Sequence, residues 1–240
     1  MNIVVVNNYD SMSEEVAKMV SAQIKCKPNS VLGLATGSSP LGVYRLLEEY
    51  HRSGVDFSQV VTFNLDEYVG LAADHPQSYR YYMEENLFSK VNVKRENSHI
   101  PNGTAKDVHE ECRRYDELIR HAGGIDLQLL GIGTNAHIGF NEPGTPFGST
   151  TQVVSLAEST IRDNARFFAS PDEVPTQAIS MGIKSIMHAK NIVLMANGGS
   201  KAEAIYAAVH GPVTPEVPAS VLQLHPSVTI VVDQAAASKL

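Results

Sequence analysis

The segment Val31-Leu-Gly-Leu-Ala-Thr-Gly-Ser-Ser-Pro40 joins a short apolar run to a turn of small residues. An uninterrupted apolar run of this length is typical of a strand that is buried on both faces. Pro40 favours the first turn of a helix, and Leu41, Tyr44 and Leu47 then fall on one helical face. The segment therefore predicts a strand, a tight turn and a helix, which is the repeating unit of an α/β fold.

Six further apolar runs have the same character, at residues 3–6, 60–63, 125–130, 153–156, 192–195 and 228–232. We expect these runs to be strands. Stretches with helical spacing lie between them, at residues 11–24, 41–50, 179–186 and 200–208. Alternating strands and helices imply right-handed crossovers and a parallel sheet between helical layers. The sequence thus predicts an α/β protein, a single three-layer Rossmann-like domain over residues 1–240 with a mostly parallel central sheet.

Composition narrows the classes of partner. The formal net charge of the 240 residues is −7, without a basic block, which argues against nucleic acid or an anionic membrane as the main partner. The N-terminus lacks the pattern of a signal peptide, and no apolar run approaches the roughly 20 residues of a membrane span. Cys26 and Cys112 lie outside any metal-ligand spacing, so we expect reduced thiols and no metal site. These features predict a cytoplasmic protein with a small-molecule ligand.

Ligands of open α/β sheets bind beyond the carboxyl ends of the strands, so the residues that follow each apolar run are the candidates for a site. After the first run, Gly37, Ser38 and Ser39 offer backbone N–H groups at the start of a helix, which suits a phosphate. A P-loop is excluded because no Gly-Lys-Ser/Thr follows. The alternative is a plain turn in which Ser39 caps the helix.

The run that ends at Phe63 is followed by Asn64-Leu-Asp-Glu-Tyr68. Neighbouring side chains at a strand end point in different directions, so one carboxylate can face a ligand while the other is structural. Asp66 or Glu67 could act as a general base if its surroundings tune its pKa. The alternative is a solvated acidic pair.

The third strand end is the loop Gly131-Ile-Gly-Thr-Asn-Ala-His-Ile-Gly-Phe-Asn-Glu-Pro-Gly144. It has the glycine spacing of a dinucleotide-binding turn, but residues 137–144 predict a constrained loop where that motif needs a helix. His137, flanked by Asn135 and Glu142, can transfer protons near neutral pH. A purely structural histidine is the alternative.

The fourth strand end, Asn197-Gly-Gly-Ser-Lys201, meets a helix in which Ser200 and Glu203 have capping-box spacing. Lys201 would then occupy the first helical position, where the helix dipole disfavours a cation unless an anion binds there. The lysine either binds such an anion or extends into water.

Taken together, Leu32 to Pro40, the Asn64 to Tyr68 segment and the long histidine loop resemble the glucosamine-6-phosphate deaminase family. The resemblance extends nearly end to end, through His99 to Gly103, Asn164 to Phe168 and the C-terminal Pro218-Ala-Ser-Val-Leu-Gln-Leu-His-Pro226. It implies conversion of glucosamine 6-phosphate to fructose 6-phosphate and ammonia, without a metal or an organic cofactor. A homo-oligomer is left open.

The resemblance also implies roles for individual residues. Asp66 would move the C2 proton of the substrate to C1, and His137 would open the sugar ring with Glu142 and Asn135 orienting it. The phosphate would bind the turn at Gly37, Ser38 and Ser39 together with Arg166 and Lys201. Arg166 rests on the resemblance alone.

One departure concerns Asn135, because some members of the family carry aspartate there, and an amide cannot share the proton of His137. Two other functions remain as alternatives. One is a 6-phosphogluconolactonase, which needs no C2 proton transfer and hence no Asp66. The other is a non-catalytic sugar-phosphate sensor of a transcription regulator, which needs a DNA-binding segment that this sequence does not show.

Overall fold

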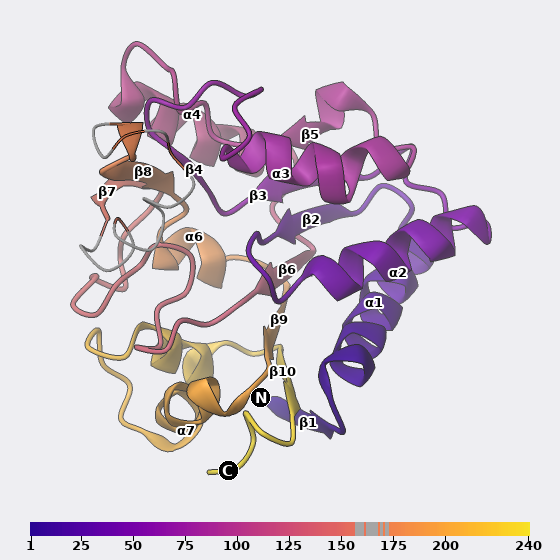
Figure 1. Cartoon of the computed structure of the whole chain (residues 1–240), viewed down its shortest axis with the longest axis vertical. Coiled ribbons are helices and arrows are strands. Elements are labelled where there is room, and N and C mark those ends of the chain that lie inside the picture. Colours follow the sequence, from indigo (N-terminus) through magenta and orange to yellow (C-terminus); the bar gives the residue numbers. More distant parts are fainter. Residues whose placement is uncertain (157–160, 162–167, 169, 171–172) are drawn as a thin grey trace.

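The computed structural model describes residues 1–156, 161, 168, 170 and 173–240. In this part of the chain seven strands form a parallel central sheet in the order β1-β10-β9-β6-β2-β3-β5 (Figure 1). Their bounds are β1 Asn2–Val6, β2 Val31–Leu34, β3 Val61–Asn64, β5 Ser98–His99, β6 Leu127–Leu130, β9 Asn191–Ala196 and β10 Val228–Asp233.

Helices cover both faces of this sheet (Figure 1). One face carries α1 Tyr9–Cys26, α2 Leu41–Arg52, α3 Tyr79–Asn86 and the short 3-10 helices η1 Phe88–Lys90 and η2 Arg95–Asn97. The other carries α4 Val108–His121, α6 Ile183–Met187, α7 Ala202–His210 and the 3-10 helices η4 Gly199–Lys201 and η5 Pro218–Leu224. The predicted three-layer α/β fold with a parallel sheet is therefore confirmed.

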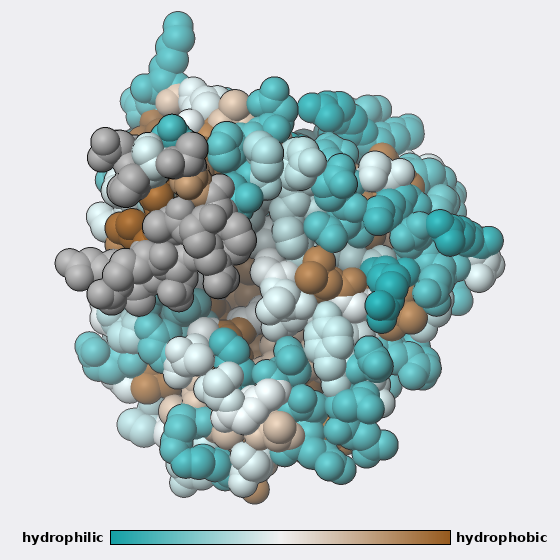
Figure 2. Space-filling model, viewed as in Figure 1, coloured by the Kyte–Doolittle hydropathy of each residue, from teal (hydrophilic) through white to brown (hydrophobic). Residues whose placement is uncertain are grey.

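Alternation along the strands divides the core into two hydrophobic layers. In β2, Leu32 and Leu34 pack against α1, α2 and α3, whereas Val31 faces the opposite layer. Both layers are buried, which is why these strands read as unbroken apolar runs in the sequence. The surface over α1, α2 and α3 is mostly hydrophilic, as Figure 2 shows, so the apolar faces of these helices turn inward.

A second, antiparallel sheet of three strands has the order β4-β8-β7. Its strands are β4 Asp66–Tyr68, β7 Gln152–Ser155 and β8 Gln177–Ser180. The sequence misassigned two of its segments. The run at 153–156 is not a strand buried on both faces, because β7 is half-buried at the rim, and Ile179 lies in β8 while only Ile183 and Ile186 are helical. Short apolar segments do not distinguish strand from helix by periodicity alone.

The strand order places the topological switch point of the sheet, where ligands of such folds bind, at β2. The chain passes from β2 to β3 on one side and returns to β6 on the other, so the crossovers diverge there. Ligands of such sheets bind in the crevice at this switch point, beyond the carboxyl ends. Because β9, β6, β2 and β3 are consecutive neighbours, all four strand ends singled out in the sequence come together.

None of the helices among the described residues is long and apolar enough to cross a membrane.

Candidate active site

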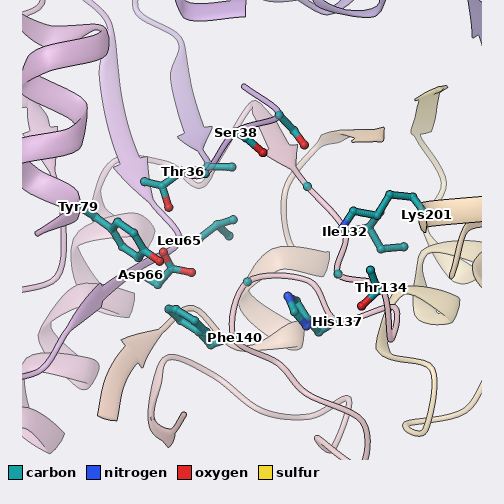
Figure 3. Close-up of a pocket in the computed structure, with 16 residues that line it drawn as sticks. Thr36, Ser38, Leu65, Asp66, Tyr79, Ile132, Thr134, His137, Phe140 and Lys201 are labelled. Carbon is teal, nitrogen blue, oxygen red and sulfur yellow. The ribbon is translucent and has the colours of Figure 1, made fainter. Parts of the chain in front are cut away.

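A cleft of about 340 Å³ opens at the carboxyl ends of β2, β3, β6 and β9 (Figure 3). It is lined by residues from each of these strand ends and from α3, namely Ala35, Thr36, Gly37, Ser38, Ser39, Leu65, Asp66, Tyr79, Gly131, Ile132, Gly133, Thr134, His137, Gly139, Phe140 and Lys201. Asp66, Tyr79 and Phe140 lie on one side of the cleft, and Lys201 and Thr134 lie on the other, with His137 between them (Figure 3). The cleft thus has two chemically different ends.

Asp66 is a buried carboxylate that faces the cleft. It begins β4, where it pairs with Ser180 of β8, and its side chain is only 6% exposed. The carboxylate has no hydrogen bond or ion pair among the described residues. Burial raises the pKa of Asp66 to about 8, and the adjacent Glu67 adds to the rise. A carboxyl group with such a pKa can both accept and return a proton near neutral pH.

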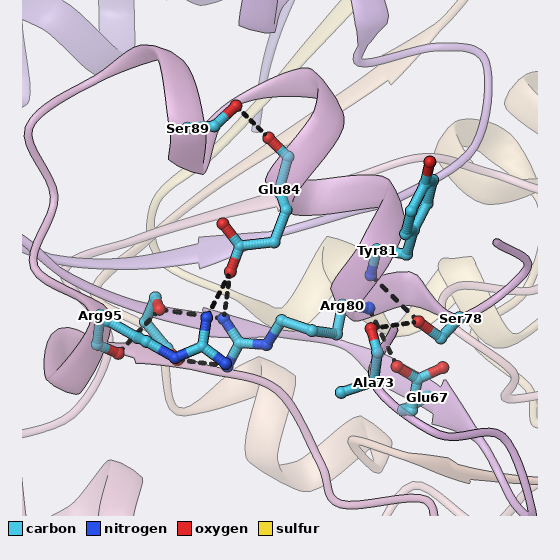
Figure 4. A network of polar contacts seen from close by, with 9 residues as sticks. Glu67, Ala73, Ser78, Arg80, Tyr81, Glu84, Ser89 and Arg95 are labelled. Atoms are coloured by element: carbon cyan, nitrogen blue, oxygen red, sulfur yellow. Dashed lines mark hydrogen bonds and ion pairs between the residues drawn. The ribbon is translucent and has the colours of Figure 1, made fainter. Parts of the chain in front are cut away.

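Glu67 is not among the described residues that line the cleft, and its carboxylate instead lies at the start of α3 (Figure 4). Its carboxylate accepts hydrogen bonds at 2.9 Å from the backbone N–H groups of Tyr68, Tyr79 and Arg80. Two of these donors belong to the first turn of α3, where backbone N–H groups lack helical partners. Burial raises the pKa of Glu67, while the three N–H groups oppose this rise. Of the two carboxylates, Asp66 is therefore the one that a ligand can reach.

Tyr79 is carried into the cleft by this anchored helix. Its hydroxyl donates to the hydroxyl of Tyr68 at 3.0 Å, and its ring stacks on Phe140 with ring centroids 6.3 Å apart. The three rings form an apolar wall beside Asp66, and this wall contributes to the burial that raises the pKa of the carboxyl group. Tyr79 lies outside every motif singled out in the sequence, and Phe140 lies within the histidine loop but carries no group that marks it for chemistry.

The loop after β6 is shaped to present His137. Ala136 has a φ of 65°, a left-handed conformation that is costly for a residue with a Cβ. The loop is closed by a hydrogen bond of 2.9 Å from the N–H of Gly133 to the carbonyl of His137. A Cβ on Gly133 would come within 2.3 Å of the imidazole ring, so only glycine leaves room for the ring in this position.

Two side chains of the same loop orient His137. Its Nδ1 lies 3.3 Å from Oε1 of Glu142, and Oε2 of Glu142 accepts a hydrogen bond of 2.6 Å from Nδ2 of Asn135. The side-chain carbonyl of Asn135 accepts in turn from the backbone N–H of His137 at 3.3 Å. His137 lowers the pKa of Glu142, and Asn135 contributes to this shift. Glu142 is thus held ionised beside the ring, where it can orient the imidazole.

The other end of the cleft is suited to an anion. Gly37 has a φ of 93°, and the N–H groups of Ser38 and Ser39 have no acceptor among the described residues. Ser39 does not cap α2, because Pro40 occupies the N-cap position without a side-chain bond. The alternative in which Ser39 is only a helix cap is therefore wrong.

Lys201 reaches this end of the cleft from the strand end of β9. It lies at the junction of η4 and α7, one position earlier than the sequence predicts, and has no ion pair among the residues that the structure describes. Burial lowers the pKa of Lys201. A half-buried cation at the start of a helix, without an ion pair among the described residues, favours an anionic ligand.

Most of the predicted site residues thus come together. Gly37, Ser38, Ser39, Asp66, His137 and Lys201 line the cleft, and Asn135 and Glu142 lie directly behind His137. Arg166 lies outside the described residues. Within the described part of the chain, no group of three or more His, Cys, Asp or Glu side chains is arranged to hold a metal ion.

The fold and the cleft define a class of α/β protein whose site is suited to an anion at one end and to proton transfer at the other. Comparison with known proteins narrows this class. Residues 7–231 match the family described as glucosamine-6-phosphate isomerases/6-phosphogluconolactonase. The chain belongs to this family.

Two bacterial relatives show which enzymes of this family the chain is similar to in sequence. The chain is 59% identical to a glucosamine-6-phosphate deaminase of Thermoanaerobacter pseudethanolicus over 239 residues, which cover 99% of this chain and 94% of that protein. It is 57% identical to the glucosamine-6-phosphate deaminase of Clostridioides difficile over 241 residues, covering 100% of this chain and 97% of that protein. The resemblance to glucosamine-6-phosphate deaminases seen in the sequence is confirmed.

Solved structures agree. A structure described as a monomeric glucosamine-6-phosphate deaminase is similar with a TM-score of 0.96 and 46% identity, covering 100% of both chains. The 6-phosphogluconolactonase from Trypanosoma cruzi is similar with a TM-score of 0.80 at 17% identity, covering 100% of this chain and 96% of that one. At that identity the second likeness shows the fold alone.

Proposed function

We propose that this protein is a glucosamine-6-phosphate deaminase, which converts glucosamine 6-phosphate and water to fructose 6-phosphate and ammonia. The close relatives carry this name over nearly the whole length of the chain. The observation in the structure that supports it most is Asp66, a buried carboxylate with a pKa raised to about 8, placed opposite the N–H groups of Ser38 and Ser39 and the Lys201 ammonium. Isomerisation of a sugar phosphate needs such a base, whereas hydrolysis of a lactone does not.

The two ends of the cleft fix how the substrate lies. The phosphate on C6 would accept hydrogen bonds from the N–H groups of Ser38 and Ser39 and pair with Lys201. The sugar then extends past His137 toward Asp66, so that C1 and C2 reach the carboxylate. Arg166 as a further phosphate ligand stays a prediction.

Proton transfers by two groups account for the reaction. His137, polarised by Glu142, moves the proton of the anomeric hydroxyl to the ring oxygen and opens the sugar ring. Asp66 then removes the proton on C2 while the C1 oxygen takes a proton from the ammonium group of the substrate, which gives an enolamine, and Asp66 delivers its proton to C1. Water adds to C2 of the resulting imine, the C–N bond breaks, and ammonia leaves with the remaining proton.

Asn135 holds Glu142 in place through the 2.6 Å bond but cannot itself exchange a proton. His137 and Glu142 therefore form the complete proton-transfer pair at this position.

We also propose that residues 1–240 form one domain, because both hydrophobic layers lie against the same central sheet. A cytoplasmic location fits a substrate whose phosphate does not cross membranes. The sequence left a homo-oligomer open, whereas the similar solved deaminase is described as monomeric. We propose a monomer, and light scattering of the purified protein tests this directly.

The proposed reaction is tested by incubating the purified protein with glucosamine 6-phosphate and measuring both products. Ammonia and fructose 6-phosphate are expected in equal amounts, and 6-phosphogluconolactone should be hydrolysed no faster than in buffer. A well-folded protein that hydrolyses the lactone but releases no ammonia would show that the function is that of a lactonase.

A further inference from the structure

Two tyrosine hydroxyls hold the carbonyl groups of the turn after β2. Tyr82 on α3 donates to the carbonyl of Gly37 at 2.6 Å. Tyr9, the first residue of α1, donates to the carbonyl of Ser38 at 3.1 Å, and its hydroxyl accepts from the N–H of Gly42 in α2 at 2.8 Å. Side chains of α1 and α3 thus each form a hydrogen bond with one of two consecutive peptide groups of the turn.

Because the peptide group is planar, a hydrogen bond that fixes a carbonyl also fixes the direction of the following N–H group. In a trans peptide the C=O and the following N–H point in opposite directions, and the described chain has no cis bond. Fixing the carbonyl of Gly37 therefore fixes the N–H of Ser38, and fixing the carbonyl of Ser38 fixes the N–H of Ser39. Tyr9 and Tyr82 are not among the described residues that line the cleft, whereas Ser38 and Ser39 are. The carbonyls are accordingly held away from the cleft and the two free N–H groups toward it.

Other features of the turn show why it needs such support. Gly37, with its φ of 93°, gives the peptide groups around it more freedom to rotate than any other residue would. No side chain caps α2. Without the tyrosine hydroxyls, the two carbonyls would have no hydrogen-bond donor among the described residues, and an inverted peptide group would present an oxygen atom to a phosphate.

Two further features support the contacts of Tyr9 and Tyr82 with the turn. A Cβ on Gly42 would come within 2.3 Å of the Ser13 hydroxyl and 3.1 Å of the Tyr9 ring, so glycine at this position lets α1 approach closely enough for Tyr9 to reach the turn. Burial raises the pKa of Tyr82, and the neighbouring Tyr9 adds to the rise. The Tyr82 hydroxyl thus keeps its proton, and remains a donor, near neutral pH.

We propose that Tyr9 and Tyr82 are positioning residues of the phosphate site: they orient the N–H groups of Ser38 and Ser39 for a phosphate without touching it. The proposal rests on the function proposed above, because it needs the sugar phosphate at this end of the cleft. It adds two residues from outside the cleft that determine affinity for the phosphate group and not the rate of proton transfer at the other end.

The test compares Tyr9→Phe, Tyr82→Phe and the double variant with the wild type. Phenylalanine keeps the ring packing and removes only the hydroxyl. Tyr81→Phe is the matched control, because Tyr81 is the neighbour of Tyr82 on α3, is 37% exposed, and its hydroxyl has no partner in the described part of the chain. The measurements are calorimetric binding of inorganic phosphate, KM and kcat for glucosamine 6-phosphate, and the melting temperature.

Each of Tyr9→Phe and Tyr82→Phe should weaken phosphate binding and raise KM by about 3- to 10-fold, as expected for one lost hydrogen bond. The double variant should lose more than either single one, kcat should change less than about 2-fold, and Tyr81→Phe should behave as wild type.

A fall in melting temperature with unchanged KM and unchanged phosphate affinity would show that the tyrosines are only structural, which overturns the proposal. It would leave the deaminase function intact, because the wild type would still release ammonia. A wild type that neither binds phosphate nor releases ammonia would overturn both.

Discussion

Replacing Asp66 by asparagine should affect stability and activity in different ways. Stability relative to the wild type should increase with pH, whereas activity should fall. The ordinary pKa of 3.8 rises to about 8 in the folded chain because the carboxyl group is buried. A group with a raised pKa stabilises the folded state fully below its unfolded pKa, and that contribution is lost as the pH rises through the folded pKa. Between pH 4 and 8 the folded protein holds Asp66 protonated while the unfolded chain is ionised, so stability falls with each step in pH.

The size of this cost follows from the shift. One pKa unit corresponds to about 1.4 kcal/mol, so the cost is at most about 2 kcal/mol at pH 5.5 and about 5 kcal/mol at pH 8. Asparagine has nearly the same shape and no charge. The stability of Asp66→Asn relative to wild type should therefore increase by about 1 to 3 kcal/mol from pH 5.5 to pH 8.

Urea unfolding at the two pH values measures this change, with the free energy of unfolding extrapolated to water. Asp74→Asn is the control, since Asp74 is exposed and should show no such increase. If the free energies of unfolding of Asp66→Asn and wild type differed by the same amount at both pH values, the claim that burial disfavours the ionised carboxylate would be refuted. Loss of that carboxylate should at the same time lower kcat/KM by about 100-fold or more.

Four further outcomes follow from the same cleft. The kcat/KM of the wild type should rise with pH until the pKa of Asp66, about 8, is passed, because the base acts when deprotonated; a rate profile that is flat from pH 6 to 9 would contradict this. Gly133→Ala should lower kcat by about 10- to 100-fold by displacing the ring of His137, with little change in melting temperature; unchanged kcat would disprove that the ring position matters. Glu142→Gln should lower kcat by about 100-fold while leaving phosphate affinity unaltered, as kinetics and calorimetry can show together. Lys201→Ala should raise KM by about 10-fold or more, and an unaltered KM would exclude Lys201 from the phosphate site.

The sequence predicts the central sheet well because buried parallel strands are recognisable as unbroken apolar runs. The residues at 31–34 and 192–195 are strands for this reason. The second sheet is not predictable in the same way. Asp66 to Tyr68 carries two charges and an aromatic side chain, and its strand conformation depends on pairing with β8, which is distant in sequence.

The candidate site also contains residues that can be predicted from the sequence and residues that cannot. His137, Asn135 and Glu142 are close in sequence, so one rigid loop is enough to predict that they meet. The choice between Asp66 and Glu67 needs the fold, because it depends on the N–H groups at the start of α3 that bind Glu67. The hydroxyl contacts of Tyr9 and Tyr82 with the phosphate turn come from packing of separate helices and have no local signal in the sequence.

The account depends most on Asp66 as the base that moves the C2 proton. The most direct test is ammonia release from glucosamine 6-phosphate by wild type and by Asp66→Asn, with phosphate binding measured on both proteins. We expect the wild type to be active and the variant to bind phosphate normally, with its activity reduced about 100-fold or more. A variant that is folded, binds phosphate and deaminates the substrate within about 3-fold of the wild-type rate would contradict the account, since a general base contributes far more than that.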